Sequence, residues 1–326
     1  MNAPILPKKH HFVPECYLKN FIVNRYLYSL DIRKVEKGYN AHPKKCQAGM
    51  ICYYEDYYKI QSQLVDTQFK LNEYADLFIE TEVLHKLEQE YTRLFRNITT
   101  YNKLSFKDAV SLSDFIIQLK LRNPYWLENT IESHKDEWID TAIDNIYEET
   151  FMKLERFNHI PEEIQKKVYD YIRAHSKSDS NYSKKIQLSG LIRRYSENDD
   201  RNNIFREAII KSKWILLISP LNGPYFVTSD NPGFSTTHVD DRIYNTRFSN
   251  DYIFHFPLSP RFCLMITDIS IENDTYDKKM NKNILRLNVD SDIIIEINNR
   301  SLQCINKLII ASEKSYLEKI AALNKP

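Results

Sequence analysis

Glycine is the residue type that this sequence most clearly lacks. Only five glycines occur among 326 residues, and no two of them are closer than ten positions. A dinucleotide-binding fingerprint or a Walker A loop needs glycines a few positions apart, because there the backbone must approach phosphate groups closely. The sequence therefore excludes nucleotide binding through a glycine-rich loop.

Paired cysteines and long apolar runs are also lacking. The five cysteines form no C-x-x-C pair, and the N-terminal stretch MNAPILPKKHHF has no apolar run of the kind found in secretory signals. No window approaches the roughly 18 apolar residues of a membrane span. We therefore expect a cytoplasmic protein with reduced thiols and no membrane contact.

Neither sign of charge is in excess. The 45 Lys and Arg residues balance 44 Asp and Glu residues, which leaves a net charge of +1. A balanced chain has no overall field that would attract nucleic acid or an anionic membrane. Nucleic acid or a nucleotide would need a local site, and a protein partner is equally compatible with this composition.

The hydrophobic pattern changes twice along the chain. Alternating Tyr, Leu and Ile at 25–34 predict a strand, and apolar residues at three- and four-residue steps predict helices over about 67–210. Short β-branched and aromatic runs over about 213–300 predict strands, SDIIIEINN among them, and RSLQCINKLIIAS predicts a final helix. This order favours one α+β domain over 1–326, with a mixed or antiparallel sheet built mainly from the C-terminal third plus an N-terminal strand.

Three local signals mark helix ends. Ser105, followed three positions later by Asp108, has the pattern of an N-cap. Pro124 interrupts a long apolar helix or starts a new one, and Pro161 has the sequence context of a first helical turn.

Four short motifs follow one another in the chain: HHFVPECYLKNF, IQLKLRNP, FVTSDNPGF and FPLSP. Together they resemble the bacterial family DUF4238, a domain of unknown function with an HH-x-VP-x-x-x-L-x-x-F opening, a Gln/Leu-rich helix that ends in Arg and then Pro, and TSDNP and PLSP signatures. The likeness spans roughly residues 8 to 262. Glu15 and Cys16 depart from it, since Gln and an aromatic residue or Leu are common there. The resemblance implies a family but no reaction.

His10 and His11 are the first candidates for chemistry. A histidine titrates near neutral pH and serves as an acid, a base or a metal ligand. Neighbours in an extended segment point to opposite faces, so at most one of the two faces inward, and we favour His11 because it directly precedes Phe-Val-Pro. The structural alternative is that one histidine packs on the core while Pro14 fixes the turn into a helix.

Asp230 is the second candidate. It follows a Tyr-Phe-Val strand, and loops at strand ends often present functional carboxylates. Ser229 and Asn231 flank it and are candidate substrate contacts. Asp-Asn-Pro is also ordinary turn chemistry, in which the side chains bond to nearby amides.

Arg122 ends the apolar helix FIIQLKLR, and Gln118 lies one turn earlier on the same face. A buried guanidinium must be paired, because an unpaired charge in the core is costly. A substrate phosphate or carboxylate would serve as the partner of this guanidinium. An internal ion pair is the alternative, with one of three acidic residues as partner: Glu80, Glu82 or Glu88.

Metal binding is a weaker hypothesis. His42, Cys46 and Cys52 do not match the spacing of familiar zinc sites. A histidine with Asp230 and a helical Glu would suit Mg²⁺ or Mn²⁺ in phosphodiester cleavage. A likeness to the HNH nucleases rests only on the opening motif, Asn40 and His42.

The clustered tyrosines at 53–58 would stack nucleic-acid bases, or more simply pack in an aromatic core.

Two functions follow from these candidates. In the leading one, the chain is a nuclease-like hydrolase or transferase of bacterial toxin or defence type that acts on a phosphate-containing substrate. A histidine would be the base or a ligand, Asp230 would orient it or bind a divalent metal, and Arg122 would hold phosphate, all in one pocket. In the alternative, the chain is a non-enzymatic binding or partner module whose HHxVP and TSDNP motifs are structural.

Overall fold

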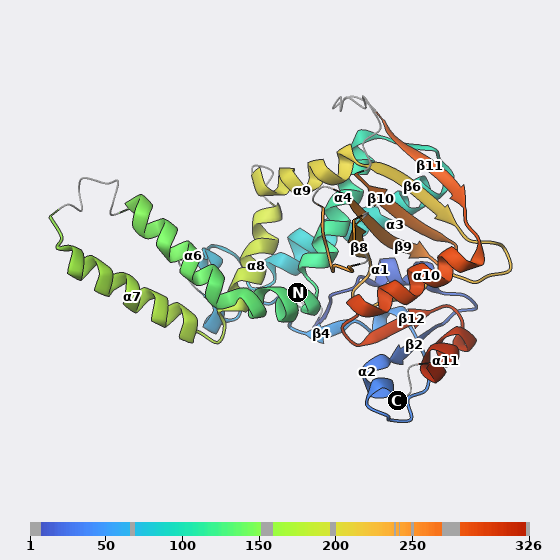
Figure 1. Ribbon diagram of the computed structural model, residues 1–326, viewed down its shortest axis with the longest axis horizontal. Coiled ribbons are helices and arrows are strands. Elements are labelled where there is room, and N and C mark those ends of the chain that lie inside the picture. The colour runs from blue at the N-terminus through green and yellow to red at the C-terminus, as the bar shows by residue number, and fades with distance from the viewer. Residues whose placement is uncertain are drawn as a thin grey trace, which may run out of the picture.

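The computed structural model describes residues 8–65, 69–150, 159–195, 200–237, 239–240, 242–248, 251–268 and 281–323. Figure 1 shows a body of sheets and helices from which one pair of helices extends as an arm. The α+β class predicted from the sequence is confirmed. Residue 67, where helices were expected to begin, lies outside the described residues.

The larger sheet has six strands in the order β5-β11-β6-β10-β9-β8. Strand β11 runs parallel to β6, and the other neighbours are antiparallel. Except for β5, all of these strands come from the C-terminal third, as expected. Their bounds are β5 Lys103–Leu104, β6 Lys213–Ile218, β8 Phe234–Thr237, β9 Tyr252–Ser259, β10 Phe262–Thr267 and β11 Lys282–Asn288.

A second, fully antiparallel sheet joins the two ends of the chain in the order β3-β2-β12-β7. The predicted N-terminal strand is its strand β2. It is shorter than 25–34, because the Asp31 side chain accepts a hydrogen bond from the Lys34 amide and caps a short helix. The strands are β2 Leu27–Asp31, β3 Lys44–Cys46, β7 Thr228–Ser229 and β12 Leu308–Ala311, while β1 Lys9–His11 pairs separately with β4 Tyr53–Glu55.

Helices fill the middle of the chain and cover the sheets. The α-helices are α1 Glu15–Leu18, α2 Ile32–Glu36, α3 His85–Thr100, α4 Phe106–Leu121, α5 Pro124–Trp126, α6 Glu132–Thr150, α7 Glu162–Ser178, α8 Tyr182–Tyr195, α9 Asp200–Lys211, α10 Ser291–Ser301 and α11 Lys314–Leu323. Two π-helical segments, η5 Ile79–Leu84 and η6 Leu127–Ile131, both contact α8. Short 3₁₀ turns are η1 Lys19–Phe21, η2 Ala48–Met50, η3 Ser62–Leu64, η4 Leu71–Glu73 and η8 Leu302–Cys304.

Helix α4 lies in the core. Its Phe115 ring stacks on Tyr91 of α3, with ring centroids 4.1 Å apart. The Ser105 hydroxyl caps α4 by accepting a hydrogen bond from the Asp108 amide at 3.1 Å, as predicted. The helix ends at Leu121 and Pro124 occupies the first position of α5, where a missing N–H costs nothing. Pro161 is the N-cap of α7, one position before its first turn.

Two elements near the C-terminus were predicted wrongly. SDIIIEINN forms helix α10, because Asp290 caps it and Ile294 and Ile297, three residues apart, bury one face. RSLQCINKLIIAS contains the last two residues of α10, then η8 and then strand β12, whose Ile309 and Ile310 are both fully buried. A short apolar run buried on both faces cannot be told from a helix by its periodicity.

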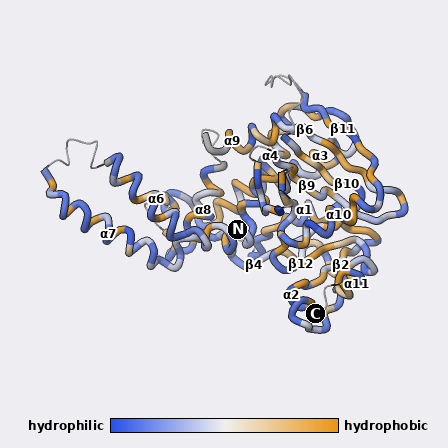
Figure 2. Tube along the Cα trace, in the orientation of Figure 1, coloured by the Kyte–Doolittle hydropathy of each residue, from blue (hydrophilic) through white to orange (hydrophobic). Residues whose placement is uncertain are grey.

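The arm consists of α6 and α7. A small apolar cluster, which includes Ile139, Ile143 and Tyr169, joins the two helices near α8. Figure 2 shows that the arm is mostly hydrophilic, with isolated hydrophobic residues, whereas strands of the larger sheet are largely hydrophobic. Over the described part of the chain, no helix combines the length and apolarity that crossing a membrane requires.

Candidate functional site at the motif junction

All four sequence motifs meet in the core, at a place that we call the motif junction. Tyr17, from the opening motif, donates its hydroxyl hydrogen to the Pro257 carbonyl at 2.6 Å and lies 2.7 Å from the Thr228 hydroxyl. It therefore ties the opening motif to FPLSP and to TSDNP at once. Burial raises the pKa of Tyr17 well above its ordinary value, so this phenol stays protonated.

Arg122 joins the helical motif to the opening one. Its Nε donates to the Phe12 carbonyl at 3.2 Å, and its Nη1 pairs with Glu88 at 2.8 Å. The side chain is only 3% exposed, so both contacts form away from bulk solvent. An ion pair was one of the two alternatives for this arginine, and Glu88 is the partner.

His10 is the inward-facing histidine, and the preference for His11 was wrong. His10 is fully buried, and its Nδ1 accepts a hydrogen bond from the Tyr58 amide at 2.9 Å, which requires Nδ1 to carry no proton. The Tyr58 ring stacks on the His10 ring, and its hydroxyl donates to the Arg122 carbonyl at 2.8 Å. Tyr58 thereby connects the histidine with the arginine.

His11 points to the other side, as the extended backbone requires. It is half-buried, and its Nε2 lies 3.4 Å from the Gly49 carbonyl oxygen. Burial lowers the pKa of His11, and the charge of Arg122 acts in the same direction, so the ring is mainly neutral at pH 7.

The Asp230 carboxylate is bound to the backbone. Its Oδ1 accepts from the Asn306 amide at 2.9 Å, and its Oδ2 accepts from Lys307 and Leu308 at 2.7 and 2.8 Å. Burial raises the pKa of Asp230 to about 6, and the three N–H groups oppose that rise. These bonds hold the start of β12, and their donors lie 76 to 78 positions further along the chain, so they are structural but are not the local turn bonds that were the alternative to catalysis for this residue.

Asn123 links the arginine segment to the aspartate segment. Its amide donates to the Asp230 carbonyl at 2.6 Å, and its Oδ1 caps α5 through the Tyr125 amide. Sequence reasoning missed this residue, although an Asn directly before Pro is an N-cap signal.

Lys120 was also missed. Its buried Nζ donates to three neutral oxygens: Asn231 Oδ1 at 3.1 Å, the Gly233 carbonyl at 2.5 Å and Asn245 Oδ1 at 3.0 Å. Burial lowers the pKa of Lys120 to about 7. A lysine inside the apolar run FIIQLKL was the available signal, because such a charge needs partners.

Ser229 bonds within its own motif, where its hydroxyl accepts a hydrogen bond from the Asn231 amide at 3.1 Å.

A small cavity of about 10 Å³ lies beside Arg122 and Gln118, with Pro14 and Glu88 in its wall. That is room for about one water molecule. The Gln118 Oε1 and Arg122 Nη2 atoms are buried there without a hydrogen-bond partner in the protein. The wall does not include His10, Asp230, Ser229 or Asn231, so the predicted residues share a junction but not this cavity.

The model of the family described as "Protein of unknown function (DUF4238)" matches residues 9–315. The chain belongs to the DUF4238 family. Neither the search of curated proteins nor the search of solved structures returned a match. In this DUF4238 protein, the four motifs that carry the resemblance are the segments that bond to one another at the junction.

The described residues of this DUF4238 chain contain no group of three or more His, Cys, Asp or Glu side chains placed to hold a metal ion. Both Asp230 oxygens are already occupied by backbone N–H groups. The catalytic and metal roles predicted for the junction residues stay predictions.

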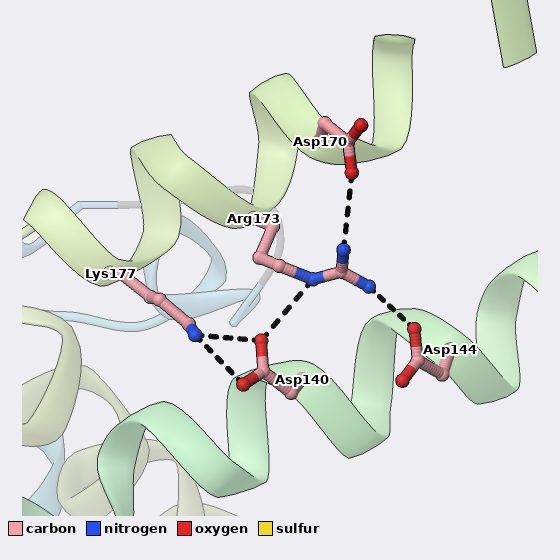
Figure 3. A network of polar contacts seen from close by, with 5 residues as sticks. All are labelled: Asp140, Asp144, Asp170, Arg173 and Lys177. Carbon is pink, nitrogen blue, oxygen red and sulfur yellow. Dashed lines mark hydrogen bonds and ion pairs between the residues drawn. The ribbon is translucent and has the colours of Figure 1, made fainter. Parts of the chain in front are cut away.

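A different surface lies on the arm. Helix α7 exposes an apolar stripe, which we call the α7 stripe: Ile164, Val168, Tyr171 and Ile172. These residues follow three- and four-residue steps, so they lie on one face of the helix. On another face, Arg173 bridges Asp140 and Asp144 of α6 as well as Asp170, and Lys177 pairs with Asp140 (Figure 3). The ion-pair network holds α7 on α6 and leaves the stripe uncovered in the single chain.

Proposed function

We propose that this DUF4238 protein is a non-enzymatic partner module. The motif junction holds the segments of the protein body together, and the arm contacts a protein partner through the α7 stripe. The observation that carries this proposal is the stripe itself, whose four side chains are between 41% and 72% exposed on one helical face. A contiguous apolar patch on a projecting element is typical of an interaction surface.

The motif junction also supports a non-enzymatic function, because its polar groups have structural roles. Tyr17, Asn123 and Asp230 direct their polar groups at other parts of the protein, with backbone atoms as most of their partners. Groups used in this way contribute to stability and are not free to bind a substrate.

The test separates stability from function. Asp230→Ala and Tyr17→Phe should lower the melting temperature, and they should affect a cellular phenotype only through protein abundance. Val168→Glu combined with Tyr171→Glu should abolish the phenotype at unchanged abundance and melting temperature. Ile204→Glu, at a position 66% exposed on α9, is the matched control. If the stripe variant keeps a full phenotype, the proposal fails.

A second candidate function is a nuclease-like enzyme of bacterial toxin or defence type. Its phosphate-containing substrate would be nucleic acid or a nucleotide. The observation that favours it is the cavity wall, where Arg122 Nη2 and Gln118 Oε1 have no protein partner. The half-buried His11 lies within the electrostatic influence of Arg122 and Glu88. A substrate phosphate would have to displace Glu88 from the guanidinium.

This candidate has its own test. The purified protein is incubated with single- and double-stranded oligonucleotides and nucleotides, with and without Mg²⁺ or Mn²⁺. Cleavage or transfer that disappears in His11→Ala at unchanged melting temperature would support it. Activity that His11→Ala and Arg122→Lys leave intact would exclude this site.

A further inference from the structure

A larger cavity, of about 580 Å³, lies where strands β7 and β12 part. The two strands pair at Thr228 and Ile310, so a continued ladder would place Phe226 opposite Ser312. The Phe226 amide instead donates to the Pro260 carbonyl at 2.9 Å. The two segments therefore diverge, and both line a cavity within the range of small-molecule sites, about 300–1,000 Å³.

Asn298 of α10 holds the β7 side of this cavity in place. Its Oδ1 accepts a hydrogen bond from the Val227 amide at 3.1 Å, and its Nδ2 donates to the Tyr225 carbonyl at 2.9 Å. A side-chain amide that binds a backbone N–H and a backbone C=O takes the place of a neighbouring strand. Asn298 is 1% exposed, so this wall is fixed by buried contacts within the single chain.

The other wall is the start of helix α11. Ser315, Tyr316 and Lys319 line the cavity at three- and four-residue steps, so they lie on one face of that helix. The first N–H groups of a helix have no partner within it and carry a partial positive charge. This wall therefore favours a negatively charged ligand.

Ser312 has a buried side chain that lacks a partner. It lines the cavity two positions before the first residue of α11, and it is only 7% exposed. In the part of the chain that the structure describes, its hydroxyl makes no hydrogen bond. Most buried hydroxyl groups in proteins are hydrogen-bonded. A ligand in the cavity would supply the acceptor that Ser312 lacks.

Of the described residues that line the cavity, only Lys319 and Glu313 are charged. Lys319 is exposed and makes no ion pair with another described residue, whereas Lys314 on the same helix pairs with Glu318 at 2.7 Å. Glu313 offsets the charge of Lys319, which leaves the partial positive charge of the helix start. That balance suits a ligand with one negative charge better than a doubly charged phosphate ester.

The remaining wall offers apolar and aromatic surface. Ile295 of α10, which is 41% exposed, lines the cavity together with Pro224 and Tyr225. The Tyr225 hydroxyl donates to the Leu221 carbonyl at 2.8 Å, so the ring is the part of Tyr225 that is left for a ligand. Surfaces of this kind bind the apolar body of a small molecule.

We infer that this cavity binds a small organic carboxylate with an apolar or aromatic body. The carboxylate accepts hydrogen bonds from the Ser312 hydroxyl and from the first N–H groups of α11, and Lys319 adds electrostatic attraction. The body of the ligand packs on Ile295 and Tyr225. None of these residues belongs to the α7 stripe, so the inference is independent of the proposed function.

Ligand-observed NMR titration of the full chain with 3-phenylpropionate tests the inference. The wild type should bind this probe with a dissociation constant of roughly 1 mM or below. The uncharged 3-phenylpropanamide and the doubly charged 3-phenylpropyl phosphate should each bind at least ~3-fold more weakly. The inference is overturned if the carboxylate shows no saturable binding up to about 20 mM, or if the amide or the phosphate ester binds as tightly.

Variants of the lining residues locate the site. Ser312→Ala should weaken binding of 3-phenylpropionate roughly 5-fold and Lys319→Gln roughly 3-fold, whereas Glu313→Gln should tighten it roughly 2-fold. Lys314→Gln, on the same helix but outside the lining, is the matched control and should change binding less than about 2-fold.

The melting temperature of each variant checks its fold. Because Lys319 is exposed, Lys319→Gln keeps the test decisive even if Ser312→Ala does not fold. Binding that neither Ser312→Ala nor Lys319→Gln weakens, or that Lys314→Gln weakens as much as Lys319→Gln does, overturns the assignment of the carboxylate to this cavity.

Discussion

Three charged side chains are buried at the motif junction, and each is stabilised differently. Arg122 has an acidic partner, Asp230 has three backbone N–H donors, and Lys120 has three neutral oxygen acceptors. An ammonium group has three donors, so Lys120 is fully satisfied in its charged form. Each charge therefore depends on segments distant in sequence, and removing a partner leaves an uncompensated group in the core.

Asp230→Asn should destabilise the protein by about 2–4 kcal/mol. The amide nitrogen of Asn would meet N–H donors in place of an acceptor, and at least one backbone amide would lose its bond. Urea denaturation gives the free energy of unfolding directly. Asp76→Asn, at an exposed position, is the control and should change it by less than about 0.5 kcal/mol. Equal effects of the two substitutions would contradict the structural role of Asp230.

Glu80 provides a pH-dependent test. Burial raises the pKa of Glu80 from 4.5 to about 7, against the opposing charge of Arg122. The folded state thus holds this proton more tightly than the unfolded state, and the resulting stability is present below pH 4.5 and lost as pH rises through 7.

Glu80→Gln, which mimics the protonated form, should be nearly neutral at pH 5. At pH 8.5 it should be more stable than the wild type by about 1–2 kcal/mol, because partial exposure reduces the effect of the shift. Denaturation curves of both proteins at the two pH values measure this. A difference between the proteins that does not change with pH would show that Glu80 titrates normally.

At the scale of elements, the junction is a set of side-chain bonds between α1, β7 and β9. Tyr17 is the common member, because its hydroxyl reaches both Thr228 and Pro257. Such bonds fix how the opening segment lies against the two sheets.

Tyr17→Phe should cost about 1–3 kcal/mol, since it leaves the buried Pro257 carbonyl without its donor. Combined with Thr228→Val in a double-mutant cycle, it should show a coupling energy of at least about 0.5 kcal/mol. Tyr17→Phe paired with Thr99→Val, on the far part of α3, should be additive. Additivity in both cycles would mean that the Tyr17–Thr228 contact contributes no coupling.

Periodicity and caps predicted much of this architecture. The Ser105 cap and the break at Pro124 follow from local sequence, and the order of predicted elements led to the expectation that an N-terminal strand joins C-terminal strands in a sheet. The two elements that were predicted wrongly, α10 and β12, are short apolar segments. Whether each forms a helix or a strand is decided by burial and, in α10, by the Asp290 cap. The choice between His10 and His11 failed for a related reason, because the strand partner decides which face is buried.

The candidate site was harder to predict than the fold. The four motifs are the segments that bond to one another at the junction, but Tyr17, Asn123 and Lys120 within them were not singled out. Their importance comes from contacts with residues more than 100 positions away. Only the three-dimensional arrangement brings such residues together, and a single sequence carries no signal of those distances.

At the scale of the whole molecule, the junction and the arm are stabilised by different interactions. The junction relies on buried hydrogen bonds, whereas the arm relies on exposed ion pairs around Arg173 and on a small apolar cluster (Figure 3). Exposed pairs contribute about 0.2–1 kcal/mol each. The arm should therefore open locally at a lower free energy than the body, as projecting elements with few buried contacts do.

Arg173→Met keeps the aliphatic stem and removes the pairs with Asp140 and Asp144, so that Lys177–Asp140 alone remains of the network that joins α7 to α6. We expect amide hydrogen exchange in α6 and α7 to become roughly five-fold faster, while exchange in α4 and the melting temperature of the body stay unchanged. Peptide-resolved exchange by mass spectrometry measures both regions in one experiment. If exchange in α4 accelerates as much as in α7, then arm and body unfold as one cooperative unit, and stripe variants could no longer be interpreted apart from stability.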